Sequence, residues 1–186
     1  MMSSTTNTAI QIVVILTFGT WVLTLLSVVT LFSKKLQNIA IEKGFDQDLL
    51  LKIRSLVLVV GALGSLYFSE IANFPPCKLC WGQRMFIFPL AAMSVIAIFN
   101  KTKTNYWLFI VAPILGSGVS IYHILIERFP SLHGVTSCDA SAPCSTPPFE
   151  YWGFLTLACM ALTIFVATIV LTLTSNKLKI NNKLNK

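Results

Sequence analysis

Five long apolar stretches limit what this chain can fold into more than any other feature of its sequence. The first covers residues 10–32 without a charged side chain, which is enough to cross a hydrocarbon core of about 30 Å. Four others follow at residues 55–74, 85–99, 106–126 and 151–174. The stretch at residues 85–99 is short, but it is long enough to span a membrane when it is counted from Cys80. Only 11% of the 186 residues are charged, and the mean hydropathy is +0.75. Because soluble domains have about 25% charged residues, we predict an all-α integral membrane protein.

The first stretch is expected to remain in the protein as a membrane anchor. A cleaved signal peptide would have a basic N-terminal region and small residues at its cleavage site. No residue before Ile10 is charged, and residues 27–33 form a poor cleavage site. The net charge of +7 would indicate nucleic acid binding in a soluble protein. Here the charge is concentrated in loops and a tail, so we expect no nucleic acid partner.

The distribution of charge predicts how the stretches are oriented. The connector at residues 34–54, the turn at residues 100–105 and the tail at residues 176–186 hold 11 of the 14 basic residues but 3 of the 7 acidic ones. The positive-inside rule places these segments in the cytoplasm. The N-terminus is then outside, the C-terminus inside, and both cysteine-bearing loops extracytoplasmic. Gly44 is expected to end a short helix in the connector, and the tail is expected to be disordered or to lie on the lipid headgroups.

A Cys-x-x-Cys pair, Cys77 and Cys80, lies directly before the third apolar stretch. Pro75 and Pro76 prevent a helix from entering this pair from the N-terminal side. The pair is therefore expected at a helix start, where unpaired N–H groups stabilise a thiolate. Arg84 follows Cys80 by one helical turn on the same helix face. This arrangement favours a redox-active or metal-binding pair over an inert structural one.

A second pair, Cys138 and Cys144, lies in the loop at residues 127–150 on the same side of the membrane. Two dithiols on one face permit three interpretations. They can be structural disulfides, or they can form a four-thiolate zinc site, although the spacing of Cys138 and Cys144 fits zinc poorly. They can also form a thiol–disulfide relay, in which one pair passes electrons to the other. Spacing and topology favour the relay and leave the other two interpretations open.

Several segments together resemble the DsbB family of disulfide-bond-formation proteins, and within it the branch called disulfide formation protein C. They are Gly64-Ser-Leu-Tyr-Phe-Ser-Glu-Ile71, Cys77-x-x-Cys-Trp-x-Gln-Arg84, Ser120-Ile-Tyr-His-Ile-Leu-Ile-Glu127, the loop pair Cys138 and Cys144, and Trp152-Gly-Phe-Leu. The resemblance implies a four-helix transmembrane bundle, to which this chain adds one extra N-terminal transmembrane helix. It divides the chain into the extra helix and connector at 1–54, a redox core at 55–176 and a basic cytoplasmic tail at 177–186.

The resemblance also implies a function, that of a membrane thiol oxidase. Such a protein reoxidises a thioredoxin-like, DsbA-type oxidase outside the cytoplasm and passes the electrons to a membrane quinone, menaquinone or ubiquinone. By position, Cys80 takes the role of the thiolate that contacts the quinone ring, Cys77 is its disulfide partner, and Arg84 supports quinone reduction. Cys138 takes the role of the cysteine that forms the mixed disulfide with the partner oxidase, and Cys144 resolves it. No metal is expected.

Further polar residues near the outer ends of the helices are candidates for the quinone site. Glu70 and His123 are ionisable groups in membrane segments, where such groups commonly have a function, here proton uptake by the reduced quinone. The alternatives are helix-end residues at the headgroup level, or a hydrogen bond between the two. Gln83 either hydrogen-bonds a quinone carbonyl or bridges helices. Cys159 is expected in the middle of its span as a small packing residue.

Two other functions stay open at this point. A relative of the vitamin K epoxide reductases would use a similar bundle and a Cys-x-x-Cys pair, but the Pro-Pro turn and the following Gln83-Arg84 argue against it. A membrane scaffold or sensor with structural disulfides would not be an enzyme at all. The number of free thiols before and after quinone is added would separate these classes.

Overall fold

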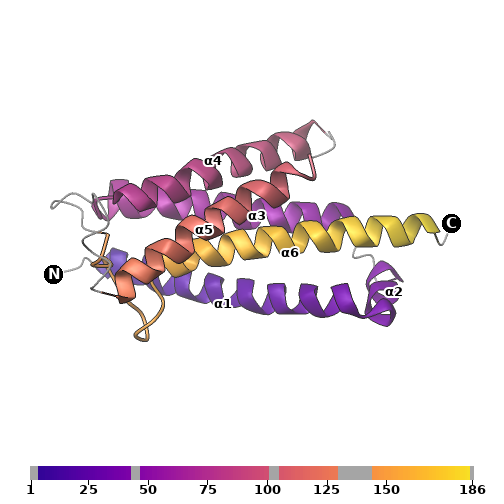
Figure 1. The fold of residues 1–186 in the computed structure, drawn as a ribbon, viewed down its shortest axis with the longest axis horizontal. Coiled ribbons are helices and arrows are strands. Elements are labelled where there is room, and N and C mark those ends of the chain that lie inside the picture. Colours follow the sequence, from indigo (N-terminus) through magenta and orange to yellow (C-terminus); the bar gives the residue numbers. More distant parts are fainter. Residues whose placement is uncertain (1–3, 43–46, 101–104, 130–143, 185–186) are drawn as a thin grey trace.

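The computed structural model describes residues 4–42, 47–100, 105–129 and 144–184 (Figure 1). Its helices are α1 (Ser4–Phe32), α2 (Lys34–Glu42), α3 (Gln47–Leu66), the π-helical turn η1 (Tyr67–Ile71), α4 (Lys78–Phe99), α5 (Leu108–Arg128) and α6 (Leu157–Leu184). Within these ranges, five helices are long and apolar enough to cross a membrane. The prediction of a multi-pass helical membrane protein is confirmed. The helix end expected at Gly44 and the turn at residues 101–104 lie outside the described residues.

Helix α6 lies at the centre of the bundle. It packs against α1, α3 and α5, while α4 packs against α3 and α5. Trp21 on α1 donates its indole N–H to Thr163 Oγ1 on α6 at 2.8 Å. A Cβ placed on Gly61 of α3 would lie 2.4 Å from Cδ1 of Ile164, so the missing side chain permits the close approach of α3 to α6.

The two ends of the bundle carry different parts of the chain (Figure 1). α1 and α4 begin, and α5 ends, at one end, which we call the cysteine end because Cys77 and Cys80 lie there. α6 ends at the opposite end, where α2 also lies. Since α4 and α5 run in opposite directions, the first turn of α4 is close to the last turns of α5.

Arg54 is buried within α3, whereas the sequence analysis assigned it to the polar connector. Its side chain is 2% exposed, its Nη1 donates to Thr172 Oγ1 at 3.2 Å, and its guanidinium carbon lies 3.7 Å from the centroid of the Phe109 ring. The second membrane span consequently begins near Asp48 instead of Ser55. The aromatic face and the hydroxyl replace part of the hydration that the charge loses inside the bundle.

The last helix differs from the sequence prediction at both of its ends. It begins at Leu157 instead of residue 151, because the preceding residues form a tight loop closed by an antiparallel bridge between Tyr151 and Leu155. It then continues to Leu184, so the tail is helical up to this residue and not disordered as one expectation had it.

Contacts with other helices hold the tail in α6. Leu178 is buried in a cluster with Leu50 and Leu171, and Lys177 donates to the Leu31 carbonyl oxygen at 2.7 Å. The apolar contacts reach α3, and the lysine reaches the last turn of α1. Such contacts exist only after the helices have assembled, so the basic composition of the tail did not reveal them.

Candidate functional site

The Cys-x-x-Cys pair lies where the chain turns from η1 into α4. Asn73 adopts a left-handed conformation with φ of 56°, and Cys77 is extended and forms the N-cap of α4. Its Sγ accepts a hydrogen bond from the backbone N–H of Cys80 at 3.3 Å. The sulfur thereby satisfies a helix N–H that would otherwise have no partner within the helix. The helix start predicted at this pair is confirmed.

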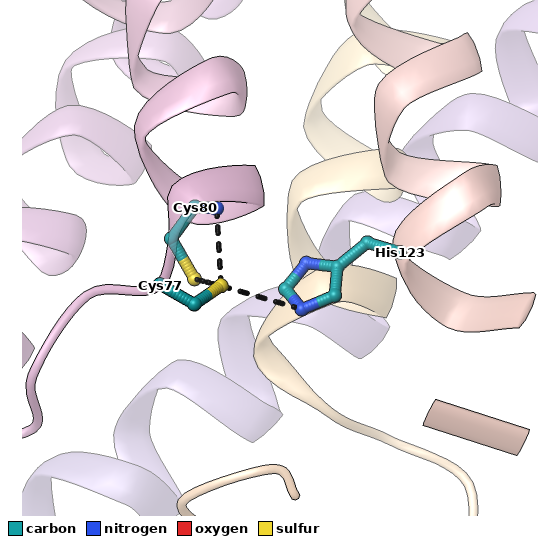
Figure 2. A group of neighbouring side chains, drawn as sticks. All are labelled: Cys77, Cys80 and His123. Carbon is teal, nitrogen blue, oxygen red and sulfur yellow. Dashed lines mark hydrogen bonds between the residues drawn. The ribbon is translucent and has the colours of Figure 1, made fainter. Parts of the chain in front are cut away.

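The two sulfurs are in contact, and a histidine from another helix meets them (Figure 2). Sγ of Cys77 lies 2.9 Å from Sγ of Cys80 and 3.6 Å from Nε2 of His123. His123 belongs to α5, is 4% exposed, and points toward the start of α4. Cys77 and Cys80 are both free thiols in this structure.

The contacts around Cys77 favour its thiolate form. The hydrogen bond with the Cys80 side chain lowers the pKa of the Cys77 thiol most, burial opposes this effect, and His123 lowers the pKa further through its hydrogen bond and charge. Together these effects bring the pKa of Cys77 to about 4. The resemblance described above gives the thiolate to Cys80. The N-cap position and a histidine that is distant in sequence favour Cys77 instead.

His123 links the pair to further buried polar groups. Gln83 Nε2 lies 3.4 Å from His123 Nδ1, and the backbone of Cys144 also hydrogen-bonds the imidazole. Glu127, one turn further along α5, has a carboxylate oxygen 3.7 Å from His123 Nε2 and accepts a hydrogen bond from Thr156 at 2.7 Å. His123 Nε2 faces both the Cys77 sulfur and the Glu127 carboxylate.

Arg84 is held beside the pair by α3. Its side chain is 6% exposed, Nε donates to Ser65 Oγ at 2.8 Å, and Nη2 donates to the Ser65 carbonyl oxygen at 2.7 Å. The guanidinium carbon also lies 5.3 Å from the centroid of the Trp81 ring. Because all these partners are neutral, they orient the positive charge of Arg84 without cancelling it.

A cavity of ≈ 700 Å³ joins these residues. Small-molecule sites in proteins have volumes of about 300–1,000 Å³. The candidates from the sequence analysis that line it are Cys77, Cys80, Gln83, Arg84, His123 and Cys144. Ser65 and Glu127 complete the polar end, and the remaining wall is largely apolar and comes mostly from α1, α3 and α6. The cavity therefore combines a polar end at the cysteines with a long apolar part.

Cys144, which follows α5 in the chain, also lies at the polar end of the cavity. It is 3% exposed and packs with Cys77 and Ile126 in a buried cluster that Cys80 borders. Cys144 is disulfide-bonded. Cys138 lies outside the described residues, so its pairing with Cys144 stays a prediction. Two cysteine-bearing segments that are distant in sequence thus meet at the cysteine end.

Two residues singled out in the sequence analysis lie away from the cavity. Glu70 is exposed on η1, and its carboxylate accepts a hydrogen bond from Ser69 at 3.0 Å. Cys159 lies in the first turn of α6 instead of the middle of its span, and its thiol donates to the Phe154 carbonyl oxygen at 3.2 Å. The late start of α6 explains the difference at Cys159. Neither residue lines the cavity.

Cys77, Cys80 and His123 also form a possible set of metal ligands. One donor atom from each residue lies within 4.8 Å of the other two. Catalytic zinc sites use three protein ligands and one water, so the number of donors is sufficient. Thiol ligands bind such a metal as thiolates, so this site would exist only while both cysteines are reduced.

Glu127 and Ser65 belong to the site but were not predicted from the sequence. Glu127 follows His123 by four residues on one helix, and this spacing is a usable signal that their side chains are neighbours. Ser65 and Arg84 lie on different helices, and no local pattern connects them. That contact could be found only in the folded structure.

Comparison with known proteins finds relatives for the region that holds both cysteine pairs. The profile of the family described as "Disulfide bond formation protein DsbB" matches residues 48–175. The match contains nearly all of α3, the helices α4 and α5, and most of α6. Helices α1 and α2 lie outside it.

Individual relatives carry related descriptions. Disulfide bond formation protein C of Bacillus subtilis (strain 168) is 38% identical over 116 residues, which is 62% of this chain and 83% of that protein. A probable disulfide formation protein of Deinococcus radiodurans is 40% identical over 112 residues, 58% of this chain and 71% of that protein. The SPbeta prophage-derived disulfide bond formation protein B of Bacillus subtilis is 33% identical over 126 residues, 65% and 84% of the two chains. No solved structure matches this chain.

Proposed function

The chain belongs to the DsbB family of disulfide bond formation proteins, and on that basis we propose that it is a quinone-dependent thiol oxidase of the cell membrane. It reoxidises a thioredoxin-like oxidase of the DsbA type outside the cytoplasm and passes the electrons to menaquinone or ubiquinone. The observation that carries this proposal is the burial of Cys144 against Cys77. Because of it, Cys144 of the loop and the Cys-x-x-Cys pair are within reach of one another.

Electrons pass through two thiol–disulfide exchanges before they leave the protein. The reduced partner attacks the Cys138–Cys144 disulfide at Cys138, leaves as a disulfide, and converts the loop pair into two thiols. The loop pair then reduces the Cys77–Cys80 disulfide and regains its own. Finally the Cys77–Cys80 dithiol gives up two electrons and two protons and closes again. The sum is partner dithiol plus quinone to partner disulfide plus quinol.

The last step begins from the Cys77–Cys80 dithiol, with the loop disulfide closed. Cys77 and Cys80 are free thiols, while Cys144 is in a disulfide. The Cys77 thiolate is the form that Cys80 and His123 stabilise. His123 takes the proton that Cys77 loses, and Glu127 stabilises the resulting imidazolium. Glu127 therefore takes the position near the quinone that the sequence analysis gave to Glu70.

The polar end of the cavity fits a quinone ring. A quinone, when bound, accepts two electrons and two protons, and negative charge develops on its oxygens. Arg84 provides a buried positive charge that Ser65 holds in place, and such a fixed charge stabilises developing negative charge more than a mobile one does. Gln83 provides an amide group for a ring carbonyl, and Cys80 lines the same end of the cavity.

The cysteine end faces the outside of the cell in this proposal. Disulfides form and persist outside the cytoplasm, and the partner oxidase works there. The opposite end carries the basic connector and tail, which the positive-inside rule assigns to the cytoplasm. The N-terminus is then outside and the C-terminus inside.

Thiol counting in the purified full-length protein tests the proposal. The protein is reduced, mixed with a water-soluble quinone, quenched with an alkylating reagent and digested for mass spectrometry. We expect quinone to protect Cys77 and Cys80 from alkylation while Cys159 stays reactive. An unchanged thiol count would refute the proposal and favour a scaffold. One tightly bound zinc ion per reduced chain, with thiols that quinone does not oxidise, would favour a metal site.

A trapping experiment tests the partner. In a Cys144→Ser variant, Cys138 lacks its resolving cysteine, so the mixed disulfide with the partner should accumulate. We expect a thioredoxin-like extracytoplasmic protein in the trapped complex. A Cys138→Ser variant is the matched control and should trap much less of the same protein. Equal trapping by both variants would contradict the assigned order of the two cysteines.

A further inference from the structure

Helix α1 lies outside the region shared with the DsbB family, yet it forms one wall of the cavity that holds the cysteines. Its lining residues run from Val13 to Leu23, a distance of about 15 Å along an α-helix. The lining residues of α3 run from Ile53 to Ser65, about 18 Å along that helix. The cavity is therefore long and extends well beyond the polar end at Cys80.

Helix α6 closes the space between these two walls. Both α1 and α3 pack against α6, and residues of α6 from Leu157 to Ile164 line the cavity. On the α1 side, the position of the helix is set by the hydrogen bond from Trp21 to Thr163. On the α3 side, it is set by the close approach of Gly61 to Ile164. The result is a groove with α6 at its base and α1 and α3 as its sides.

The groove is apolar away from the cysteine end. Thr17 and Thr20 on the α1 wall donate their hydroxyls at 2.8 Å to carbonyl oxygens of their own helix, so these groups need no partner in the groove. Aliphatic side chains form most of the remaining wall. A molecule that fits the whole cavity thus has a polar, reducible head and a long apolar chain.

We propose that α1 and α3 bind the polyisoprenoid tail of the quinone between them, so that the extra helix gives the protein a preference for tailed over tailless quinones. This inference rests on the proposed function. Lipid chains are as apolar as the groove, so close packing against α1 and α3, and not escape from water, holds the tail there. A held tail keeps the ring next to Arg84 and the cysteines, and this positioning raises the rate of reaction.

Three glycines provide a matched test. Gly19 on α1 and Gly64 on α3 both line the cavity, and a Cβ at either position would meet no atom within 4 Å. A leucine at either position fills the groove without a clash at its Cβ. Gly118 on α5 has equally open surroundings and does not line the cavity. Gly118→Leu is therefore the control for the same substitution in a membrane helix.

Binding is measured with the full-length protein in detergent, using 2-methyl-1,4-naphthoquinone and the same ring with a two-isoprene tail. We expect Gly19→Leu and Gly64→Leu to weaken binding of the tailed quinone by at least about tenfold, since an extra methylene group can cost 10–200-fold in a fitted apolar site. Binding of the tailless ring should stay within twofold, which also shows that the variants are folded. Gly118→Leu should bind both compounds like the parent protein.

Photolabelling gives a second readout that does not depend on activity. A quinone with a photoreactive group at the end of its tail should label α1 between Val13 and Leu23 in the parent protein. The label on α1 should decrease in Gly19→Leu and persist in Gly118→Leu. Label confined to α4 and α5 would overturn the inference, and so would an equal loss of tailed and tailless binding in the Gly19→Leu variant.

The outcomes separate this inference from the proposed function. If the parent protein neither binds nor reduces any quinone, the proposed function fails and the inference fails with it. If the parent protein reduces quinone but all three leucine variants treat tailed and tailless compounds alike, only the role of α1 is wrong. In that case the groove holds another apolar chain, such as that of a membrane lipid.

Discussion

Nε2 of His123 lies 3.6 Å from Sγ of Cys77, although these residues belong to different helices. The contact exists because α4 and α5 run in opposite directions, which brings the start of one to the end of the other (Figure 1). It places a proton acceptor beside the thiol that caps α4. Much of the chemistry proposed for this protein depends on that contact.

The pH dependence of Cys77 reactivity should change when His123 is replaced. With a pKa of about 4, the thiolate of the parent protein persists as the pH falls, so alkylation of Cys77 should be nearly independent of pH above about 5.5. His123→Asn removes a positive charge and should raise the pKa by about 1–3 units. Alkylation should then slow as the pH falls from 8 to 5.5, as measured by mass spectrometry of Cys77.

A neighbouring substitution serves as the control for this experiment. Tyr122 is 40% exposed on the same helix, and Tyr122→Phe should keep the alkylation profile of the parent protein. If His123→Asn and Tyr122→Phe both leave the profile unchanged, His123 does not stabilise the Cys77 thiolate.

Arg84→Ala should slow quinone reduction by about 10²-fold, the typical effect of removing one group that stabilises a developing negative charge. Exchange with the reduced partner should be largely unaffected, because it occurs at the loop pair. Arg84→Lys should recover part of the rate, since it keeps the charge but loses the planar fork that binds Ser65. The measurement compares the quinone dependence of turnover with single-turnover exchange.

Arg128 provides the control for Arg84. It lies at the same end of the bundle, pairs with Glu150 at 3.2 Å, and does not line the cavity. Arg128→Ala should leave quinone kinetics unchanged. If Arg84→Ala impairs only the exchange with the partner, the Cys77–Cys80 pair is not the one that reduces quinone.

Cys159→Ala should keep oxidase activity, although not because the thiol is far from the other cysteines. Cys159 lies at the cysteine end, but its thiol donates to the Phe154 carbonyl oxygen and does not line the cavity. Steady-state turnover of the purified variant provides the test. A folded Cys159→Ala variant without turnover would mean that this thiol takes part in the relay.

Reporters at the two ends of the chain test its orientation. Single cysteines at Ser4 and Lys183, in a background without other cysteines, are treated with a membrane-impermeant maleimide in intact cells. We expect labelling at position 4 and none at position 183. Most of the basic residues lie in the segments on the same side as position 183, and the positive-inside rule places that side in the cytoplasm. Labelling only at position 183 would show that the chain has the opposite orientation in the membrane.

Thr172→Val should destabilise the bundle by about 1–3 kcal/mol, since it removes a hydrogen-bond partner of the buried Arg54 and leaves a charged donor unsatisfied. Thr168→Val on the same helix is the control, because Thr168 donates only to the Ile164 carbonyl oxygen of α6. Thermal unfolding in detergent measures both. Equal losses of stability would show that the contact between Thr172 and Arg54 contributes little.

Local features of the sequence were sufficient for the architecture and for the reactive pair. The apolar stretches are long enough to span a membrane and have few charges, and helices in lipid satisfy their own backbone groups, so the spans followed from composition and length. Pro75 and Pro76 confined the start of α4 to Cys77 by removing a backbone donor and restricting the residues before it. The five segments with family resemblance then indicated the redox chemistry.

The tertiary structure decided which side chains surround the reactive cysteines, Arg84 and the first helix. The stabilised thiolate is at Cys77 because α5 brings His123 to it, Arg84 is fixed because α3 presents Ser65, and α1 borders the cavity because it packs on α6. The tail continues α6 because Leu178 packs against Leu50 and Leu171. Each of these contacts joins separate helices, and its free energy depends on how those helices pack. No spacing within a single segment encodes that packing, so these contacts could be found only in the folded chain.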